Sequence, residues 1–445
     1  MASSHKSSIT TWLEKTNGFW FASYTVIMAF CLYVSIYAFR KTFAVATFEG
    51  IEYLGVSYKV WLVIAQVLGY GAAKFVGIKV ISELKAASRA ISILLSVSIA
   101  GVSWLFFGLI PPQYNIIFLF TNGFPLGLVW GMVFGYLEGR RFTEVLGAGL
   151  SVSFIFSAGL AKSVGGFIMR DWGVSEQWMP FAAACVFTLP LLVFLYLLDK
   201  VPPPNALDEA LRTRRQPMNG EERRKFVATF LPGIIMFTLS YVLLTVFRDF
   251  RDNFSAEVWK TLGYGNSPEI FTATEVPVSF VVLIVIGSLM IVKNNQRAFM
   301  INHIIIIFGM LLTGISTFLF QQQLISAPVW MIAIGLGLYL GYVPFNSIFF
   351  DRLLAAFHYV GTVGFLIYLA DSFGYLGNIG VLFFKEFGYA ELSWVDFFIS
   401  AGYLVSIAGA GLMTASMIYF HMRHRQLMKP EREKQHESQP STPVP

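Results

Sequence analysis

The 445-residue sequence is poor in charged residues and in cysteine. Asp, Glu, Lys and Arg make up only 13% of it, whereas hydrophobic residues make up 56%. Soluble globular chains carry about 25% charged residues, so this composition argues against a soluble domain. The two cysteines, Cys31 and Cys185, both lie within apolar runs. We expect them to be packing residues, with neither a disulfide nor a metal site.

Sequence motifs for common enzyme chemistry are also absent. The chain contains no Walker A loop, no zinc-ligand spacing, and no GxSxG or HExxH element. ATP-driven transport and hydrolysis by these routes are therefore disfavoured. We expect a protein that is not an enzyme and that uses no cofactor or metal.

Apolar runs of about 20 residues, long enough to cross a bilayer, recur along the whole chain. We predict twelve transmembrane helices, at residues 19–40, 58–81, 90–110, 114–137, 144–168, 178–198, 227–248, 270–292, 298–320, 327–350, 356–383 and 395–420. The longest polar segment, Asp199–Lys225, falls between the sixth and seventh runs. The expected fold class is therefore all-α integral membrane. The expected parts are an N-terminal half (1–198), a cytoplasmic linker (199–226), a C-terminal half (227–428) and a disordered tail (429–445).

The formal net charge of +6 would suit a nucleic-acid partner, but its distribution points elsewhere. Of the 32 Lys and Arg residues, 22 lie on the side of the membrane that the termini share. Six are placed on the opposite side: Lys41, Lys59, Arg170, Arg251, Lys260 and Lys385. By the positive-inside rule, both termini are predicted to be cytoplasmic, in a cell inner membrane. The basic charge thus reflects topology, and no nucleic-acid partner is expected.

One short stretch occurs in both halves. Tyr33–Phe43 reads YVSIYAFRKTF and Tyr241–Phe250 reads YVLLTVFRDF, which puts Arg248 208 positions after Arg40. Two further matches recur at an offset of 209: AKSVG at Ala161–Gly165 with ADSFG at Ala370–Gly374, and Gln66 with Glu275. Equivalent positions in equivalent spans indicate duplicated halves in the same orientation. This pattern predicts two pseudo-symmetric six-helix halves, as in the major-facilitator architecture.

Charged residues inside the spans are the candidate functional residues. Four cations lie in or at the ends of apolar runs: Arg40, Lys74, Lys162 and Arg248. Each costs about 2.5–3.5 kcal/mol near a helix centre, and the candidate acids within spans are Glu275 and Asp371. An anionic substrate would complete the charge balance. Arginine suits bidentate recognition of phosphate or carboxylate, and lysine adds point charge.

Several other interpretations of these residues remain open. Arg40 and Arg248 lie near the ends of their runs and could snorkel to the interface. Lys74 could pair with Glu275, and Lys162 could form a salt bridge between the halves with Asp371. The two acids could instead carry protons. Three tyrosines share a helix face with the arginines and would face the same cavity or simply pack: Tyr33, Tyr37 and Tyr241.

The motifs resemble those of one known family. Tyr33–Ala46 (YVSIYAFRKTFAVA) looks like the first-span signature of the organophosphate:phosphate antiporters of the major facilitator superfamily. Shorter segments resemble the second, seventh and eleventh spans of that family: Gly69–Gly77, Tyr241–Arg248 and Phe373–Gly377. The chain departs from the family where a histidine is expected at Lys162 and a small uncharged residue at Asp371.

The resemblance implies a monomeric rocker-switch exchanger. Arg40 and Arg248, one from each half, would clamp a phosphate moiety, with Lys74 on the family's binding-site lysine. The predicted function is secondary transport of an organophosphate or inorganic phosphate, with a small anion and the lipid bilayer as partners. Two alternatives remain. One is a proton-coupled carrier of carboxylates or anionic sugar derivatives, and the other is a transporter-like sensor of sugar phosphates.

Overall fold

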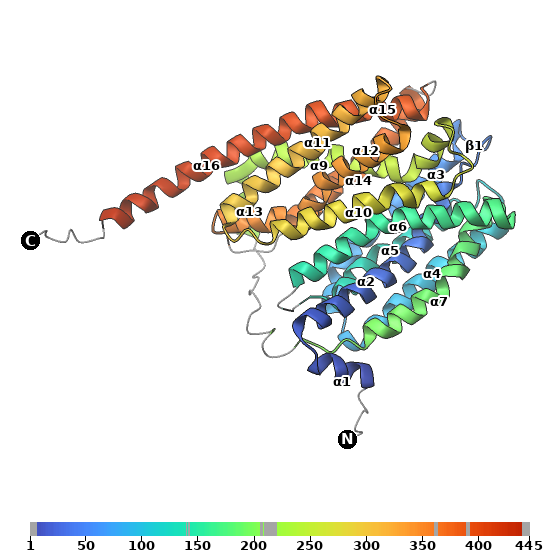
Figure 1. Ribbon diagram of the computed structural model, residues 1–445, viewed down its shortest axis with the longest axis horizontal. Helices are drawn as coiled ribbons and strands as arrows, with labels where there is room; N and C mark the ends of the chain where they lie inside the picture. Colours follow the sequence, from blue (N-terminus) through green and yellow to red (C-terminus); the bar gives the residue numbers. More distant parts are fainter. Residues whose placement is uncertain are drawn as a thin grey trace, which may run out of the picture.

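The computed structural model describes residues 7–138, 140, 143–204, 208, 220–359, 364–388 and 392–437, and these are mostly helical (Figure 1). All twelve predicted spans coincide with helices. Eleven helices in the described part are long and apolar enough to cross a membrane. The eleventh predicted span corresponds to α14 (Gly364–Gly388), which is 25 residues long. The prediction of an all-α integral membrane fold is confirmed.

The N-terminal half begins with a short helix, α1 (Ser8–Lys15), and continues through six long helices. These are α2 (Gly18–Lys41), α3 (Tyr58–Glu83), α4 (Arg89–Leu109), α5 (Ile117–Phe134), α6 (Thr143–Trp172) and α7 (Met179–Asp199). Shorter elements connect them: η1 (Thr42–Val45), the antiparallel pair β1 (Glu52–Tyr53) and β2 (Val56–Ser57), and η2 (Ala86–Ser88). This half occupies the lower right of Figure 1, in blue to green.

The C-terminal half follows the same plan. Its first helices are α9 (Gly220–Thr261), α10 (Glu269–Leu289), α11 (Asn295–Gln321) and α12 (Ala327–Pro344). The tenth span continues from α12 through the π-helix η3 (Phe345–Phe349) into α13 (Phe350–Ala356). After α14, the twelfth span consists of α15 (Trp394–Leu404), the π-helix η4 (Val405–Gly409) and α16 (Ala410–Glu437).

Two helix boundaries differ from the prediction. Helix α9 is 42 residues long and extends 13 residues beyond Arg248, where the seventh span was expected to end. Helix α16 continues to Glu437, although a disordered tail was expected from residue 429. Good helix formers such as Glu, Arg, Lys and Gln explain this extension. Residues 205–207 and 209–219 of the predicted linker, and residues 438–445 of the tail, lie outside the described part.

Most of the six basic residues that were assigned to the side opposite the termini are not at the protein surface. Lys41, Lys59, Arg251 and Lys385 are buried within the protein, with relative exposures of 1–6%. Only Arg170 and Lys260 of that group have substantially exposed side chains.

Helices α6 and α10 lie side by side at the boundary between the halves (Figure 1). Gly159 of α6 faces α10. A Cβ atom there would lie 2.6 Å from the carbonyl oxygen of Phe271 and 2.9 Å from the Cβ and Cγ atoms of Glu275. The close approach of these two helices therefore depends on a residue without a side chain.

We expect Gly159→Ala to destabilise the protein by about 1–3 kcal/mol, because the added methyl group would overpack this contact. Gly380→Ala in α14 is the matched control, since a Cβ atom there meets nothing within 4 Å. That change should be neutral or stabilise by up to about 1 kcal/mol, because alanine favours the helix. Thermal unfolding in detergent compares the two variants. Equal melting temperatures would contradict the packing described here.

Candidate functional site

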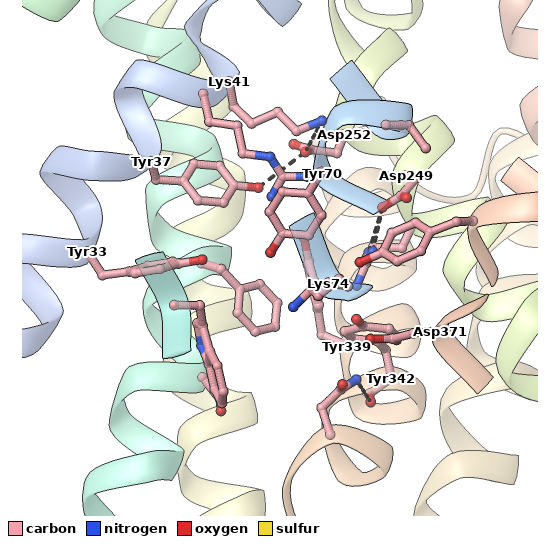
Figure 2. A pocket seen from close by; sticks show the side chains of 18 of the residues that line it. Tyr33, Tyr37, Lys41, Tyr70, Lys74, Asp249, Asp252, Tyr339, Tyr342 and Asp371 are labelled. Atoms are coloured by element: carbon pink, nitrogen blue, oxygen red, sulfur yellow. Dashed lines mark hydrogen bonds and ion pairs between the residues drawn. The ribbon is translucent and has the colours of Figure 1, made fainter. Parts of the chain in front are cut away.

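A cavity of about 180 Å³ lies between the two halves. Its lining from the N-terminal half comprises Tyr33, Tyr37, Arg40, Lys41, Val67, Tyr70, Lys74, Trp130, Ser151 and Phe154. Its lining from the C-terminal half comprises Arg248, Asp249, Asp252, Tyr339, Tyr342, Asn346, Ile367, Asp371 and Tyr375. Figure 2 shows Tyr33 and Tyr37 extending from one side toward Asp249 and Asp371 on the other. The cavity is thus bounded by both repeats, as the paired sequence motifs predicted.

Four cationic and three anionic side chains line this cavity, so its formal net charge is +1. Two of these acids, Asp249 and Asp252, were not predicted, because the seventh span was expected to end at Arg248. The longer α9 brings both into the protein interior. The signal was present in the sequence as RDFRDN, in which Asp249 and Asp252 are three positions apart and so share one face of a continued helix.

The end of α2 that carries Arg40 is anchored through its backbone. Its last carbonyl groups have no helical partner, so other groups must satisfy them. The Phe39 carbonyl accepts hydrogen bonds from Asn122 Nδ2 at 3.0 Å and Trp104 Nε1 at 2.5 Å. The Arg40 carbonyl accepts one from Gln66 Nε2 at 2.7 Å. Three side chains from neighbouring helices therefore fix the position of Arg40.

The two repeat-related arginines have similar aromatic neighbours but different ionic partners. The guanidinium carbon of Arg40 lies 3.8 Å from the ring centre of Tyr70, and that of Arg248 lies 3.9 Å from the ring centre of Tyr342. Arg248 donates to Asp249 Oδ1 from Nε at 2.9 Å and from Nη2 at 2.6 Å. Its burial and this pairing contradict the snorkelling alternative for Arg248.

Arg40 has no carboxylate partner among the residues that the structure describes. Its Nε atom is buried and has no hydrogen-bond partner there. A guanidinium group in this state retains donors for a ligand, and the low dielectric of the interior strengthens its attraction for an anion. Arg40 is thus the cavity cation most available to bind one.

Lys162 does not form the predicted salt bridge with Asp371. Its Nζ atom instead lies 2.8 Å from Asp252 Oδ1, and it also donates to the Asp252 carbonyl at 2.8 Å. Lys41 Nζ lies 3.3 Å from Asp252 Oδ2, and Tyr37 donates to the same oxygen at 3.3 Å. Lys162 is buried and does not line the cavity. It holds the carboxylate of Asp252, which does line the cavity.

Glu275 does not pair with Lys74, which was one alternative. Its Oε1 atom accepts a hydrogen bond of 2.6 Å from Arg251 Nη1, and Arg251 also donates to the Met331 carbonyl at 3.1 Å. Both side chains are buried, and neither lines the cavity. The pair therefore lies within the C-terminal half, where neutralising each charge lowers the cost of burying it.

Asp371 lines the cavity and is hydrogen-bonded to the hydroxyl group of Tyr241. Tyr241 is buried and does not itself line the cavity, unlike Tyr33 and Tyr37. Its hydroxyl also lies 3.4 Å from that of Tyr342. The repeat residue Tyr241 therefore positions an acid, while its counterpart Tyr33 faces the cavity directly.

Polar contacts between the halves gather at the end of the bundle opposite the chain termini, where α2, α6 and α9 end. Lys59 Nζ lies 2.5 Å from Glu257 Oε1, and Lys260 Nζ lies 2.6 Å from Glu49 Oε1. Ser163 Oγ donates to the Pro268 carbonyl at 2.7 Å. Together with the Asp252 cluster, these contacts join the two halves across this end.

Two six-helix halves around a central polar cavity form the major-facilitator fold. The solved structure of a D-xylose-proton symporter has a TM-score of 0.59 at 17% identity, covering 90% of this chain and 96% of that chain. A bacterial homologue of the human peptide transporters PepT1 and PepT2 has a TM-score of 0.59 at 13% identity, covering 91% and 99%. A bacterial homologue of the human lysosomal transporter Spinster has a TM-score of 0.53 at 13% identity, covering 93% and 97%. At these identities the likeness shows the fold alone.

Residues 42–423 match a family of unknown function, DUF5690, and the chain belongs to that family. The match covers most of both halves, including Lys74, Arg248 and Asp371, and it begins two residues after Arg40. No curated protein sequence matches the chain.

Proposed function

We propose that this protein is a secondary transporter of a small anion, preferably inorganic phosphate or an organophosphate, that works by alternating access. The observation that carries this proposal is Arg40, a cavity cation without a carboxylate partner among the described residues. Arginine is favoured for phosphate because its planar group can donate two parallel hydrogen bonds. The first-span resemblance supports the same substrate class.

The size of the cavity favours a small solute. The cavity volume is about 180 Å³. This is below the range of about 300–1,000 Å³ found for pockets that hold drug-sized ligands. It suits inorganic phosphate or a small phosphate ester. A sugar of similar size lacks the negative charge that Arg40 favours, so the sugar and peptides named for the structural neighbours are not the substrates that we propose.

Each candidate residue receives a role in this proposal. Arg40 is the principal anion ligand. Arg248 is a second ligand, which contacts the anion while it also contacts Asp249. Lys74 adds positive charge, and Tyr33 and Tyr37 offer hydroxyl groups. Three further residues act indirectly: Lys162 holds Asp252, Tyr241 positions Asp371, and Glu275 neutralises Arg251.

The proposed topology places both termini in the cytoplasm of a cell with an inner membrane, in agreement with the charge asymmetry. The ion pairs between the halves then close the outer end. Opening to the outside requires these pairs to separate. We propose that the protein does this as a monomer, because its cavity is completed by the two halves of one chain.

Exchange in proteoliposomes tests this function. Vesicles loaded with labelled inorganic phosphate are diluted into buffer containing phosphate, glycerol phosphate, a hexose phosphate or a plain carboxylate. Protein-dependent efflux that an external phosphate compound accelerates is the expected result. Efflux driven only by carboxylates would indicate a carboxylate carrier. Binding without flux would indicate a sensor. Either result would contradict the proposal.

A further inference from the structure

Asp371 differs from the other two acids of the cavity in its ionic partners. Asp249 is held by Arg248, and Asp252 is held by Lys162 and Lys41. Asp371 has one hydrogen bond, with the neutral Tyr241, and no cation within ion-pair distance among the described residues. A carboxylic acid exposed to a cavity inside a membrane protein, without a salt bridge, is suited to gain and lose a proton.

The charged and titratable groups around Asp371 come from each helix packed near it. Helix α3 contributes Lys74 and Tyr70, and α9 contributes Tyr241, Arg248 and Asp249. Helix α12 contributes Tyr342, and α14 itself contributes Tyr375. Lys74 is the strongest electrostatic neighbour, and Arg248 also attracts the carboxylate. These two cations would repel an ammonium group of a ligand at Asp371. A proton needs almost no space there, and its binding leaves a neutral carboxylic acid.

We propose that Asp371 takes up one proton when a dianionic solute binds, so that the solute and the proton cross together. This inference rests on the proposed function, and it names the coupling ion of the same site. The lining groups carry one net positive charge, so a bound dianion leaves one net negative charge in a buried cavity. Protonation of Asp371 makes the loaded cavity neutral, and buried net charge is costly.

Binding of the anion and of the proton should therefore favour one another. The bound anion offsets Lys74 and Arg248, the cations that favour the ionised form of Asp371, and so it increases the affinity of the carboxylate for a proton. By linkage, the protonated acid increases the affinity for the anion to the same extent. The proton comes from water on the entry side and returns to water on the exit side. Only an O–H bond forms and breaks.

The experiment measures uptake of labelled glycerol phosphate into proteoliposomes while only the internal pH is varied. A constant external pH keeps the ionisation of the phosphate itself unchanged, and potassium with valinomycin clamps the membrane potential. With the inside more alkaline by about one pH unit, one proton per solute supports about tenfold accumulation, which a protonophore abolishes. We expect this in the wild type and in the control variant Asp396→Asn, whose exposed side chain lies at the start of α15.

Asp371→Asn should lose this pH-driven accumulation but retain measurable counterflow, because exchange does not require the site to release a proton. Counterflow in this variant also shows that it is folded. Two results would overturn the proton coupling but not the proposed function. One is pronounced pH-driven accumulation by Asp371→Asn, and the other is pH-independent uptake by a wild type that exchanges well. Selective loss of phosphoethanolamine exchange in the variant would instead indicate that Asp371 binds the ammonium group of a substrate. That result would also overturn the proton coupling. No exchange of any anion by the wild type would overturn the proposed function as well.

Discussion

Arg40→Ala is expected to weaken the binding of inorganic phosphate by about 30-fold to several thousand-fold. Truncating one partner of a buried charged pair costs about 2–5 kcal/mol, and each 1.4 kcal/mol changes the affinity tenfold. In the wild type, no ion pair of Arg40 has to separate before phosphate binds, because no carboxylate among the described residues is bound to its guanidinium group. Equilibrium binding of labelled phosphate to the purified protein in detergent measures the change.

Three comparisons make this prediction specific. Arg40→Lys should lose less affinity than Arg40→Ala, because lysine keeps the charge without the planar pair of donors. Arg248→Ala should have a smaller effect on binding than Arg40→Ala, because Arg248 is already shared with Asp249. Arg297→Ala, an exposed change at the start of α11, should bind phosphate like the wild type. Equal affinities of Arg40→Ala and Arg297→Ala would contradict the role of Arg40.

A cross-link between Glu49 and Lys260 is expected to abolish transport completely. These residues belong to different halves, and their side chains are 63% and 54% exposed. Exposed pairs contribute little stability, so cysteine substitution at both positions should leave the fold intact. A short bis-methanethiosulfonate reagent would join the two cysteines in a chain that also carries Cys31→Ser and Cys185→Ser. Dithiothreitol should restore flux, because it cleaves the link and lets the outer end open.

The matched control places the same cross-link within one half. Tyr403 and Gln321 both belong to the C-terminal half, and the Tyr403 hydroxyl donates to Gln321 Oε1 at 2.6 Å. Cysteines at these two positions should cross-link without loss of flux, because the half moves as one unit. Undiminished transport by the fully cross-linked Glu49/Lys260 variant would show that this end of the bundle does not need to open.

The fold was largely predictable because long apolar runs and an internal repeat both carry a strong signal. The twelve spans follow from bilayer thickness, and the recurrence of Arg40 at Arg248 reveals the two halves. The ends of the helices were less predictable. The charged residues of RDFRDN look like the start of a loop, yet α9 continues through them, since the tertiary structure supplies their partners.

The partners of each charge were the least predictable part of the site. Lys162 and Asp371 occupy repeat-equivalent positions, but symmetry places equivalent residues on opposite halves, not necessarily in contact. The structure pairs Lys162 with Asp252 and Glu275 with Arg251. Both true partners lie in the part of α9 beyond the predicted span. Because Asp249 and Asp252 were not counted, the positive charge of the cavity was overestimated. The importance of Arg40 follows from both the sequence and the structure.

The measurement that tests the central claim most directly is an anomalous difference map from crystals grown with tungstate, a dianion that resembles phosphate. We predict a single strong peak in the cavity between Arg40 and Arg248, with the tungstate oxygens within hydrogen-bond distance of the Arg40 guanidinium. Crystals of Arg40→Ala should lack that peak. A wild-type map with no peak in the cavity at a saturating concentration, or with tungstate bound only outside it, would contradict the account.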